Sequence, residues 1–461
     1  MLRSMAAIVA AKIIMQISRW LGNQGTDLPG RVARWIDPAI LGKLAARVKG
    51  PIIVITGTNG KTTTSNMAAH ILQENGSRLV HNQAGANMVS GITAAFIKAT
   101  NLTGTRTWDY ALLETDEANV APLLSEVKAQ MLLVTNFFRD QLDRYGELDH
   151  TIGLIKNGVT GQDMQLLLNA DDPLMSSFPK DTGLPSTYYG FAETPYDVME
   201  SSDSREGRYC MICGEEIEYL RFHFAQLGIY RCPHCGNRNP AADFTAADLS
   251  LNPQITMKVN ELSITSPYQG FYNAYNILAA VTLSKVLGVE DTVIQRSIAH
   301  FEPRAGRMER FNIGGRPATL VLVKNPTGFN QSVEALLQDS STKNLFMALN
   351  DNAADGRDIS WIWDADLEVL GQPGAGIMCL VCSGLRSGDM AVRLKYAGID
   401  TNMIQIESNL EAGIKAALSG AGEVHYILST YTALFQCQKI LRRLQSEPLH
   451  KAEPRRIYEN P

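Results

Sequence analysis

Short runs of consecutive apolar residues alternate with helical periodicity through the middle of the chain. The runs at 51–57, 110–115, 130–136 and 164–171 are rich in Val, Ile and Leu, as in strands that are buried on both faces of a parallel sheet. Residues 63–76 have a helical pattern that ends at Gly76, and residues 273–288 have another. Strands that alternate with helices predict a doubly wound α/β sheet.

A second alternation begins near residue 315, after the stretch 302–317, which is rich in Gly, Pro and Arg. We expect strands at 318–323, 344–350, 376–382 and 424–429, and helices at 332–340, 387–398 and 432–444. The predicted organisation is a helical segment over 1–49, a central α/β domain over 50–311 with an insertion at 206–238, and a C-terminal Rossmann-like α/β domain over 312–461.

The first residues of the chain have apolar side chains at helical spacing. These residues are Ile8, Val9, Ile13, Ile14, Ile17 and Leu21. Lys12 and Arg19 interrupt the run, which falls short of the ~18 uncharged residues that a spanning helix needs. We expect an amphipathic helix that docks on the body of the protein or on a partner. A helix that lies on a membrane surface is the alternative.

Composition and charge are those of an ordinary globular protein. Of 461 residues, 45% are apolar and 19% are charged, enough for two or three domains, each with its own core. The formal net charge of −5 argues against a protein that coats nucleic acid. The seven cysteines do not form a disulfide framework, which together with the glycine- and lysine-containing loop at 57–63 indicates the cytoplasm.

The loop after the first strand of the central domain, in "IVITGTNGKTTTSN", has the composition of a phosphate-binding loop. Backbone N–H groups of such a turn, and of the helix that follows it, bind phosphate oxygens. Lys61 would add a positive charge at the β- and γ-phosphates, and the Thr62 hydroxyl would bind Mg²⁺. Only two residues separate the glycines, fewer than in the strict G-x-x-x-x-G-K-[ST] pattern. The predicted loop residues are Gly57, Thr58, Asn59, Gly60, Lys61, Thr62 and Thr63.

Two C-x-x-C pairs lie within the insertion, at 210–213 and 232–235, with 18 residues between them. This spacing is typical of zinc ribbons. We predict that the four thiolates of Cys210, Cys213, Cys232 and Cys235 close a structural zinc site; a catalytic metal or a redox pair is the alternative. A third pair, Cys379 and Cys382, lies in a strand pattern and is expected to be buried as small apolar residues, like Cys437.

The motif "TGTNGKTTT" resembles the ATP loop of the Mur ligase superfamily, which also includes folylpolyglutamate synthase. Glu114 in "LLETDEAN" and Asn136 in "VTNFF" stand where that superfamily has a magnesium-binding glutamate and a motif asparagine. Segments 166–173, 273–280 and 306–311 extend the likeness. The resemblance implies that ATP phosphorylates a substrate carboxylate, and that an amine then attacks the acyl phosphate. It also implies nucleotide contacts by Asp172, Asn276 and Arg307.

Several features depart from the superfamily pattern. About 50 residues precede the first strand, too few for the usual domain that binds a UDP-linked precursor. We therefore expect another kind of substrate, or one that is held differently. Gln141 replaces a metal-associated histidine. Ile155 stands where many members have a lysine that becomes carbamylated, and Lys156 is one position off, which turns its side chain by about 100° on a helix. The linker segment "LVKNPTGFNQ" retains Lys324 but lacks the usual Asp and His.

The central motifs, the zinc-ribbon insertion and the missing UDP domain together resemble the MurT family of lipid II isoglutaminyl synthase subunits. Segments 350–368, 383–398 and 429–441 agree with this. The resemblance implies that the α-carboxyl of D-isoglutamate in lipid II is amidated to D-isoglutamine. No cysteine has the context of a glutaminase nucleophile, so either free ammonia is used or another chain hydrolyses glutamine. The resemblance implies the second, a GatD-type glutaminase subunit in a heterodimer.

Such a glutaminase needs a carboxylate to orient its histidine. In "DNAADGRDISW", Asp355 replaces a superfamily lysine, whereas Asp358 matches a superfamily residue. We predict that Asp355 completes the partner's triad in trans, with Asp351 and Asp358 as alternatives. The acids could instead cap helices and turns.

The leading interpretation is an ATP-dependent amidating ligase subunit in the cytoplasm, peripheral to the inner face of the membrane. Lys61 and Glu114 would be catalytic, with Thr62 and Glu114 as magnesium ligands. A folylpolyglutamate synthase-like, amino-acid-adding ligase is a second interpretation, disfavoured by the zinc ribbon and the altered linker. A non-catalytic nucleotide-binding scaffold is the third, disfavoured because Lys61, Thr62 and Glu114 are all present.

Overall fold

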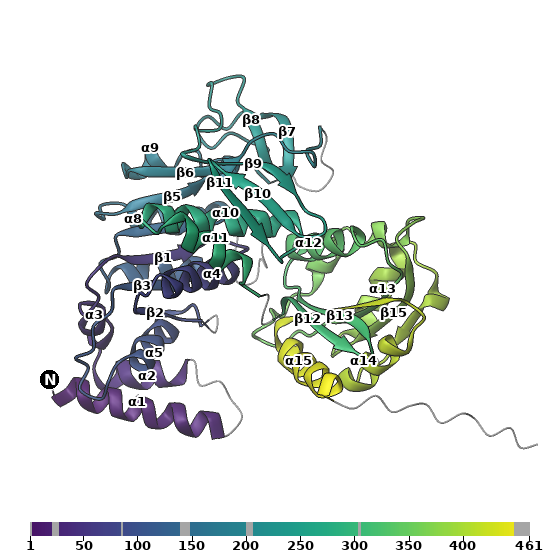
Figure 1. Ribbon diagram of the computed structural model, residues 1–461, viewed down its shortest axis with the longest axis horizontal. Helices are drawn as coiled ribbons and strands as arrows, with labels where there is room; N and C mark the ends of the chain where they lie inside the picture. Colours follow the sequence, from purple (N-terminus) through teal and green to yellow (C-terminus); the bar gives the residue numbers. More distant parts are fainter. Residues whose placement is uncertain are drawn as a thin grey trace, which may run out of the picture. The chain divides into compact units, whose positions relative to one another are not determined.

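The computed structural model describes residues 2–20, 27–83, 86–138, 148–199, 206–302 and 306–446. The chain forms two compact units, Met1–Glu302 and Pro303–Pro461, each built around its own sheet (Figure 1). The predicted boundary between the two α/β domains lay after residue 311. In the structure Arg307–Ile313 is a strand of the second sheet, so these residues belong to the second unit.

The first unit contains a nine-stranded sheet in the order β11-β10-β9-β6-β5-β4-β1-β3-β2. The strands from β2 to β9 in this order pair in parallel, and β9, β10 and β11 form an antiparallel edge. The bounds are β1 (Ile52–Thr56), β2 (Leu79–His81), β3 (Tyr110–Glu114), β4 (Met131–Val134), β5 (Gln165–Asn169), β6 (Ser186–Phe191), β9 (Phe244–Ser250), β10 (Ile255–Val259) and β11 (Leu262–Ser266).

Helices cover both faces of this sheet, as predicted for a doubly wound fold. Strand β1 is fully buried: Ile52 and Val54 face one core, and Ile53 and Ile55 face the other. The first core is covered by α1 (Leu2–Trp20), α2 (Leu28–Ile36), α3 (Ile40–Ala45), α5 (Val89–Ala99), α6 (Val120–Leu124), α8 (Leu148–Val159) and α9 (Phe178–Thr182). The second is covered by α4 (Lys61–Glu74), α10 (Phe271–Val286) and α11 (Asp291–Ala299).

Helix α1 docks on the body of the first unit, and of the predicted stripe only Ile8 is fully buried. Its buried residues are Ala7, Ile8, Ala11 and Met15. Of the predicted stripe, Val9, Ile13 and Ile17 are exposed, and Leu21 lies outside the described residues. Two alanines on the docked side allow the helix to approach its neighbours closely, and periodicity alone does not distinguish this side from the equally apolar opposite one. Among the described residues, no helix is long and apolar enough to cross a bilayer.

The insertion carries a two-stranded antiparallel hairpin, β7 (Glu218–Phe224) and β8 (Leu227–Arg231). Cys210, Ile217, Tyr230 and Cys232 form a small core of their own beside it. The cysteine-bearing end of the insertion therefore has few buried apolar residues of its own, as in small domains that depend on a bound metal for stability.

The second unit contains a six-stranded sheet in the order β12-β13-β17-β14-β15-β16, parallel except for the β12–β13 hairpin. The strands are β12 (Arg307–Ile313), β13 (Arg316–Leu322), β14 (Lys343–Ala348), β15 (Ile377–Ser383), β16 (Ile404–Ile406) and β17 (Val424–Ser429). The helices are α12 (Pro326–Leu337), α13 (Ser387–Tyr396), α14 (Leu410–Ser419) and α15 (Tyr431–Ser446). Cys382 and Cys437 are buried, as predicted, while Cys379 is partly exposed.

Candidate nucleotide-binding site and cysteine cluster

The predicted phosphate-binding loop connects β1 to α4, at the carboxyl edge of the parallel sheet. Two of its backbone positions accept only glycine. Gly57 has φ +117°, and an added Cβ would lie 2.4 Å from Thr135 Oγ1. Gly60 has φ +84°, and an added Cβ would lie 2.0 Å from Asn276 Oδ1. Because both glycines are pressed against neighbouring segments, the loop has one defined shape.

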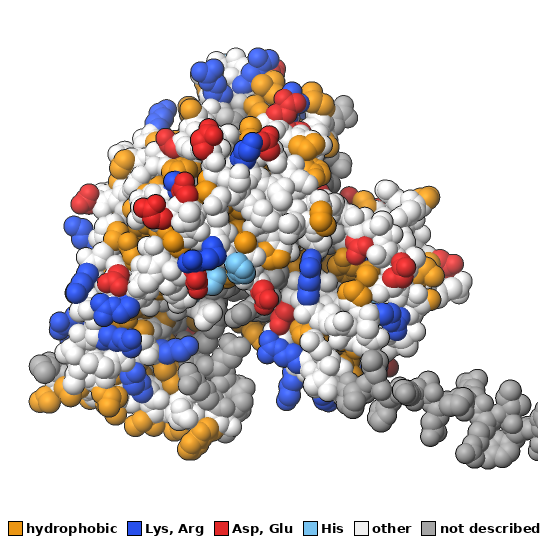
Figure 2. Space-filling model, in the orientation of Figure 1, with side chains coloured by type: hydrophobic (Ala, Val, Ile, Leu, Met, Phe, Trp, Pro, Cys, Tyr) orange, Lys and Arg blue, Asp and Glu red, His pale blue; other side chains and the backbone are white. Residues whose placement is uncertain are grey.

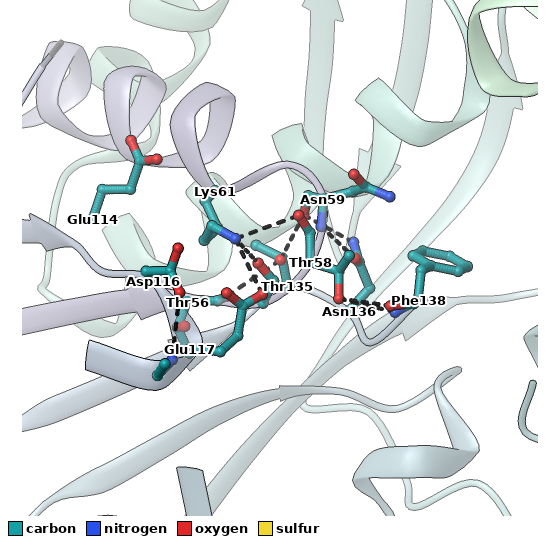
Figure 3. Close-up of polar contacts among 12 residues, drawn as sticks. Thr56, Thr58, Asn59, Lys61, Glu114, Asp116, Glu117, Thr135, Asn136 and Phe138 are labelled. Atoms are coloured by element: carbon teal, nitrogen blue, oxygen red, sulfur yellow. Dashed lines mark hydrogen bonds and ion pairs between the residues drawn. The ribbon is translucent and has the colours of Figure 1, made fainter. Parts of the chain in front are cut away.

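The segment that follows β4 holds the loop in place (Figure 3). Thr58 donates its backbone N–H to the Asn136 carbonyl at 2.9 Å. Asn59 donates its backbone N–H to Asn136 Oδ1 at 2.9 Å, and Asn136 Nδ2 donates back to the Asn59 carbonyl at 3.1 Å. Asn136, predicted as a motif residue, thus aligns the loop through both its backbone and its side chain.

Lys61 opens α4 and is almost completely buried. Its ammonium donates to the Gly57 carbonyl, to the Thr58 carbonyl at 3.4 Å, and to Glu117 Oε1 at 3.1 Å. Figure 3 shows this ammonium directed at the loop backbone and at Glu117, which lies on the short helix η1 (Glu117–Asn119). The sequence prediction missed Glu117, although it follows Glu114 by three residues in "ETDEAN". The ion pair holds the lysine beside the loop whose N–H groups are predicted to bind phosphate.

Thr62 and Glu114, the two predicted magnesium ligands, are in direct contact. Thr62 Oγ1 donates to Glu114 Oε1 at 2.8 Å. Adjacent ligands of an octahedral Mg²⁺, each about 2.1 Å from the ion, lie about 3 Å apart, so this hydroxyl and carboxylate fit one magnesium ion. Asn82 fixes the end of β3, because its side chain donates to the Glu114 carbonyl at 2.7 Å and accepts the Glu114 N–H at 2.9 Å. Thr63 is buried on α4.

Two further predicted residues lie at the same edge. Asn276 of α10 lies against Gly60, and its Nδ2 donates to Asn273 Oδ1 at 3.1 Å. Asp172 follows β5 and caps the short helix η2 (Pro173–Met175), accepting the Leu174 N–H. Burial raises the pKa of Asp172 to about 7. The third residue, Arg307, lies on β12 of the second unit, so the first unit alone does not contain it.

The departures from the superfamily pattern also have local explanations. Ile155 is fully buried in the first core. Lys156 points elsewhere and donates to Ser177 Oγ at 2.6 Å and to Asp181 Oδ2 at 2.7 Å. This lysine is therefore tied to α9 and its N-terminus, as its shifted position on the helix implied. Gln141 lies outside the described residues.

The four cysteines of the insertion come together in space. Their sulfur atoms all lie within 4.8 Å of one another, with Cys210 and Cys235 at 3.6 Å and Cys213 and Cys232 at 3.5 Å. A tetrahedral zinc ion with Zn–S bonds of about 2.3 Å places its sulfurs about 3.8 Å apart. The donor set and its spacing therefore fit a closed Cys₄ zinc site.

Three side chains in or directly after the insertion reach the predicted nucleotide-binding edge, and the sequence prediction missed them. Gln226, fully buried at the turn between β7 and β8, donates from its Nε2 to the Phe137 carbonyl. Asn237 donates to Ser176 Oγ at 3.0 Å, and Asn239 donates to the Ala170 carbonyl at 3.0 Å. The insertion is thus joined to the segments after β4 and β5 that carry Asn136 and Asp172.

In the second unit, a polar cluster lies at the carboxyl ends of β14 and β17. Asp355 is buried and accepts the Thr432 N–H at 2.7 Å, the Thr432 hydroxyl at 2.5 Å and the Asn352 N–H at 3.2 Å. Asp358 is exposed and accepts the Ser360 N–H at 2.8 Å.

The remaining residues of interest in this unit have clear local positions. Asp351 pairs with Arg386 at 2.7 Å. Lys324 follows β13 and directly precedes Asn325, which caps α12 by accepting the Gly328 N–H at 2.8 Å.

Comparison with known proteins agrees with this geometry. Residues 55–284 match the Mur ligase middle domain. Among solved structures, the fold resembles a pseudomurein peptide ligase type C from Methanothermus fervidus, with 22% identity, a TM-score of 0.66 and coverage of 87% of this chain and 80% of that chain. It also resembles MurF from Acinetobacter baumannii, with 15% identity, a TM-score of 0.62 and coverage of 90% and 81%. The fold and the site define a Mur ligase-type, ATP-dependent ligase, a class for which ATP and Mg²⁺ are expected.

Matches that extend over most of the chain identify the particular family. Residues 322–434 match the MurT ligase C-terminal family. Relatives in two genera carry the name lipid II isoglutaminyl synthase (glutamine-hydrolyzing) subunit MurT. The protein from Staphylococcus aureus strain COL is 39% identical over 87% of this chain and 90% of its own length. The protein from Streptococcus pneumoniae strain R6 is 35% identical over 92% and 94%. The chain belongs to the MurT family, as the sequence motifs predicted.

Proposed function

We propose that this chain is the synthetase subunit that amidates the α-carboxyl of D-isoglutamate in the stem peptide of lipid II, giving D-isoglutamine. The observation that carries the proposal is the loop that places Lys61 beside its backbone and Thr62 against Glu114 of β3, in a chain of the MurT family. Lys61 and the loop N–H groups would bind the triphosphate directly, and Thr62 and Glu114 would do so through Mg²⁺.

The proposed chemistry has two steps. A carboxylate oxygen of the substrate attacks the γ-phosphorus of ATP, the bond to the β-phosphate oxygen breaks, and ADP leaves. Ammonia then attacks the carbonyl carbon of the acyl phosphate, the nitrogen loses a proton, and phosphate leaves as the amide forms. Lys61 and the loop N–H groups stabilise the charge on the transferred phosphoryl group.

The magnesium ion would be held by Thr62 and Glu114, and it would neutralise charge on the phosphate oxygens. The zinc ion of the Cys₄ cluster would be structural, because four thiolates leave it no open position.

The ammonia would come from a GatD-type glutaminase subunit. The word subunit in the relatives' name supports a partner of this kind. The substrate is lipid-linked, so the chain would work in the cytoplasm at the inner face of the membrane. We further propose that a carboxylate of the 351–358 segment orients the partner's catalytic histidine. Asp355 is the predicted residue, and Asp358 is the second candidate because it is exposed.

The function is tested by supplying the chain with ATP, lipid II in detergent micelles, and ammonium or glutamine. Ammonium alone should support amidation, whereas glutamine should support it only when the glutaminase subunit is added. Lys61→Met should abolish amidation from both nitrogen sources. The matched control is Lys128→Met, an exposed lysine with a long 3.8 Å ion pair to Asp163, which should leave the rate unchanged. Amidation by Lys61→Met at the wild-type rate would refute the proposal.

The role of the second unit is tested by comparing the amidation rate with glutamine to the amidation rate with ammonium. Replacing the triad carboxylate with asparagine, as Asp355→Asn or Asp358→Asn, should stop turnover with glutamine and spare turnover with ammonium. Asp389→Asn, on the surface of α13, is the control that should change neither. Equal losses with both sources would show that the residue supports the fold or the synthetase site instead.

A further inference from the structure

Helix α1 has a second apolar face that the first unit does not cover. The inner face, with Ala7, Ile8, Ala11 and Met15, packs in the core. The outer face is a line of exposed residues at spacings of three and four along the helix. Its members are Leu2, Ala6, Val9, Ile13, Ile17 and Trp20.

This outer face is large for a protein surface. Ile13 is 54% exposed and Trp20 is 80% exposed. The helix has 19 residues and is therefore about 28 Å long. Trp35, on the neighbouring α2, is 83% exposed. Figure 2 shows hydrophobic side chains gathered along the lower edge of the first unit, where Figure 1 places α1. Contiguous apolar surface of this kind marks a binding face.

Charge indicates what this face binds. Residues 1–50 contain eight Lys and Arg and two Asp, a net charge of +6, in a chain whose total is −5. Both acids are neutralised within the segment, because Asp27 pairs with Arg31 at 2.6 Å and Asp37 pairs with Lys43 at 2.7 Å. The exposed basic residues include Arg3, Arg47 and Lys49. Of the basic residues, Arg34 pairs with Glu126 outside the segment at 2.7 Å. The segment is still a local positive region on an acidic protein.

We propose that the outer face of α1 lies in the surface of an anionic membrane, with the basic residues of the segment near the lipid phosphates. Helices that combine an apolar face, tryptophan and basic residues bind in this way without crossing the bilayer. A second copy of the chain is a poorer occupant, since a two-fold contact through this face would bring the two +6 segments together. The inference rests on the proposed function, because it explains how the ligase would be held beside a lipid-linked substrate.

The test is co-sedimentation of the full chain with vesicles, either pure phosphatidylcholine or a mixture with phosphatidylglycerol. The wild-type chain should bind the mixed vesicles and release as salt is raised. Ile13→Glu/Ile17→Glu places two negative charges on the outer face and should weaken binding at least about tenfold. The matched control, Val392→Glu/Ile406→Glu, alters two exposed residues of the second unit and should bind as the wild type does. All four positions are exposed, so thermal unfolding should confirm that both variants fold.

Amidation assays in micelles and in vesicles distinguish a failure of this inference from a failure of the proposed function. The α1 variant should amidate lipid II at the wild-type rate in detergent micelles, but at least about tenfold more slowly when lipid II is embedded in mixed vesicles. Equal vesicle binding by wild type and variant would overturn the membrane proposal. So would a wild-type dimer that dissociates in the variant, or failure of the wild type to bind mixed vesicles. A chain that binds vesicles but amidates lipid II in neither form would instead refute the proposed function.

Discussion

Replacing Gly60 with alanine tests whether the loop geometry governs nucleotide binding. Gly60 has φ +84°, and an added Cβ would lie 2.0 Å from Asn276 Oδ1. Real Cβ contacts essentially never fall below 3.0 Å, so the Asn276 side chain or the loop must shift by at least about 1 Å. The side chain of Asn276 is buried and hydrogen-bonded to Asn273, and it therefore has little freedom to move.

The structure contains a matched control for this change at the other end of the same helix. Gly76 has φ +80°, and an added Cβ there would meet nothing within 4 Å. Gly76→Ala should therefore show only the left-handed backbone penalty, about 1 kcal/mol. Gly60→Ala should show this penalty together with the displacement of a buried, hydrogen-bonded amide, which costs roughly a further 1–3 kcal/mol. The free energy of unfolding should fall by roughly 2–4 kcal/mol in all.

The assay is titration calorimetry with a non-hydrolysable ATP analogue and Mg²⁺, together with thermal unfolding. Gly60→Ala should weaken nucleotide binding at least about tenfold, because the loop N–H groups no longer converge on the phosphates. Gly76→Ala should bind the analogue within about twofold of the wild type. The reasoning would be refuted if both variants bound it equally well, or if Gly76→Ala lost as much affinity as Gly60→Ala.

Three further results are expected. Gln226→Leu removes the bond from the insertion to the Phe137 carbonyl and should raise the KM for ATP several-fold, whereas the control Gln372→Leu, at an exposed site in the second unit, should leave it unchanged. Elemental analysis should find one zinc per chain, and a Cys232→Ser variant should lose the zinc and weaken ATP binding, whereas Cys379→Ser should keep both. Because burial raises the pKa of Asp172 to about 7, this group stabilises the fold fully below its ordinary pKa and loses its contribution as the pH rises through 7. Urea unfolding at about pH 5 and pH 8 should show a smaller difference in Asp172→Asn than in the wild type.

The parts of the fold that the sequence predicted are those with strong local signals. The buried strands of the first unit are continuous apolar runs. The loop with Gly57, Gly60 and Lys61 has a composition that is rare outside phosphate-binding loops. Glu114 and Asn136 belong to or follow strands β3 and β4, which flank β1 in the sheet, so their meeting with the loop follows from the parallel topology. The clustering of the four insertion cysteines likewise follows from their spacing in the sequence.

Other features depend on contacts between segments that are distant in the sequence, and no local pattern predicts such contacts. Gln226 lies in a hairpin turn 89 residues from Phe137, and nothing in its neighbours marks it as buried. The predicted stripe of α1 was only partly right, with Ile8 buried but Val9, Ile13 and Ile17 exposed. Both sides of that helix are apolar, and only packing decides which side is covered. The Gly-, Pro- and Arg-rich stretch 302–317 contains the division between the two units, which falls after Glu302. The exact point expected, after residue 311, came too late because β12 pairs with β13, and no local pattern shows this pairing.

The central claim is that the substrate carboxylate takes the γ-phosphoryl group of ATP before nitrogen attacks. The most direct measurement uses lipid II labelled with ¹⁸O in the α-carboxyl of its D-isoglutamate, incubated with the chain, ATP, Mg²⁺ and ammonium. The account predicts that one labelled oxygen per turnover appears in inorganic phosphate, and that Lys61→Met produces none. Amide formation with unlabelled phosphate would contradict it.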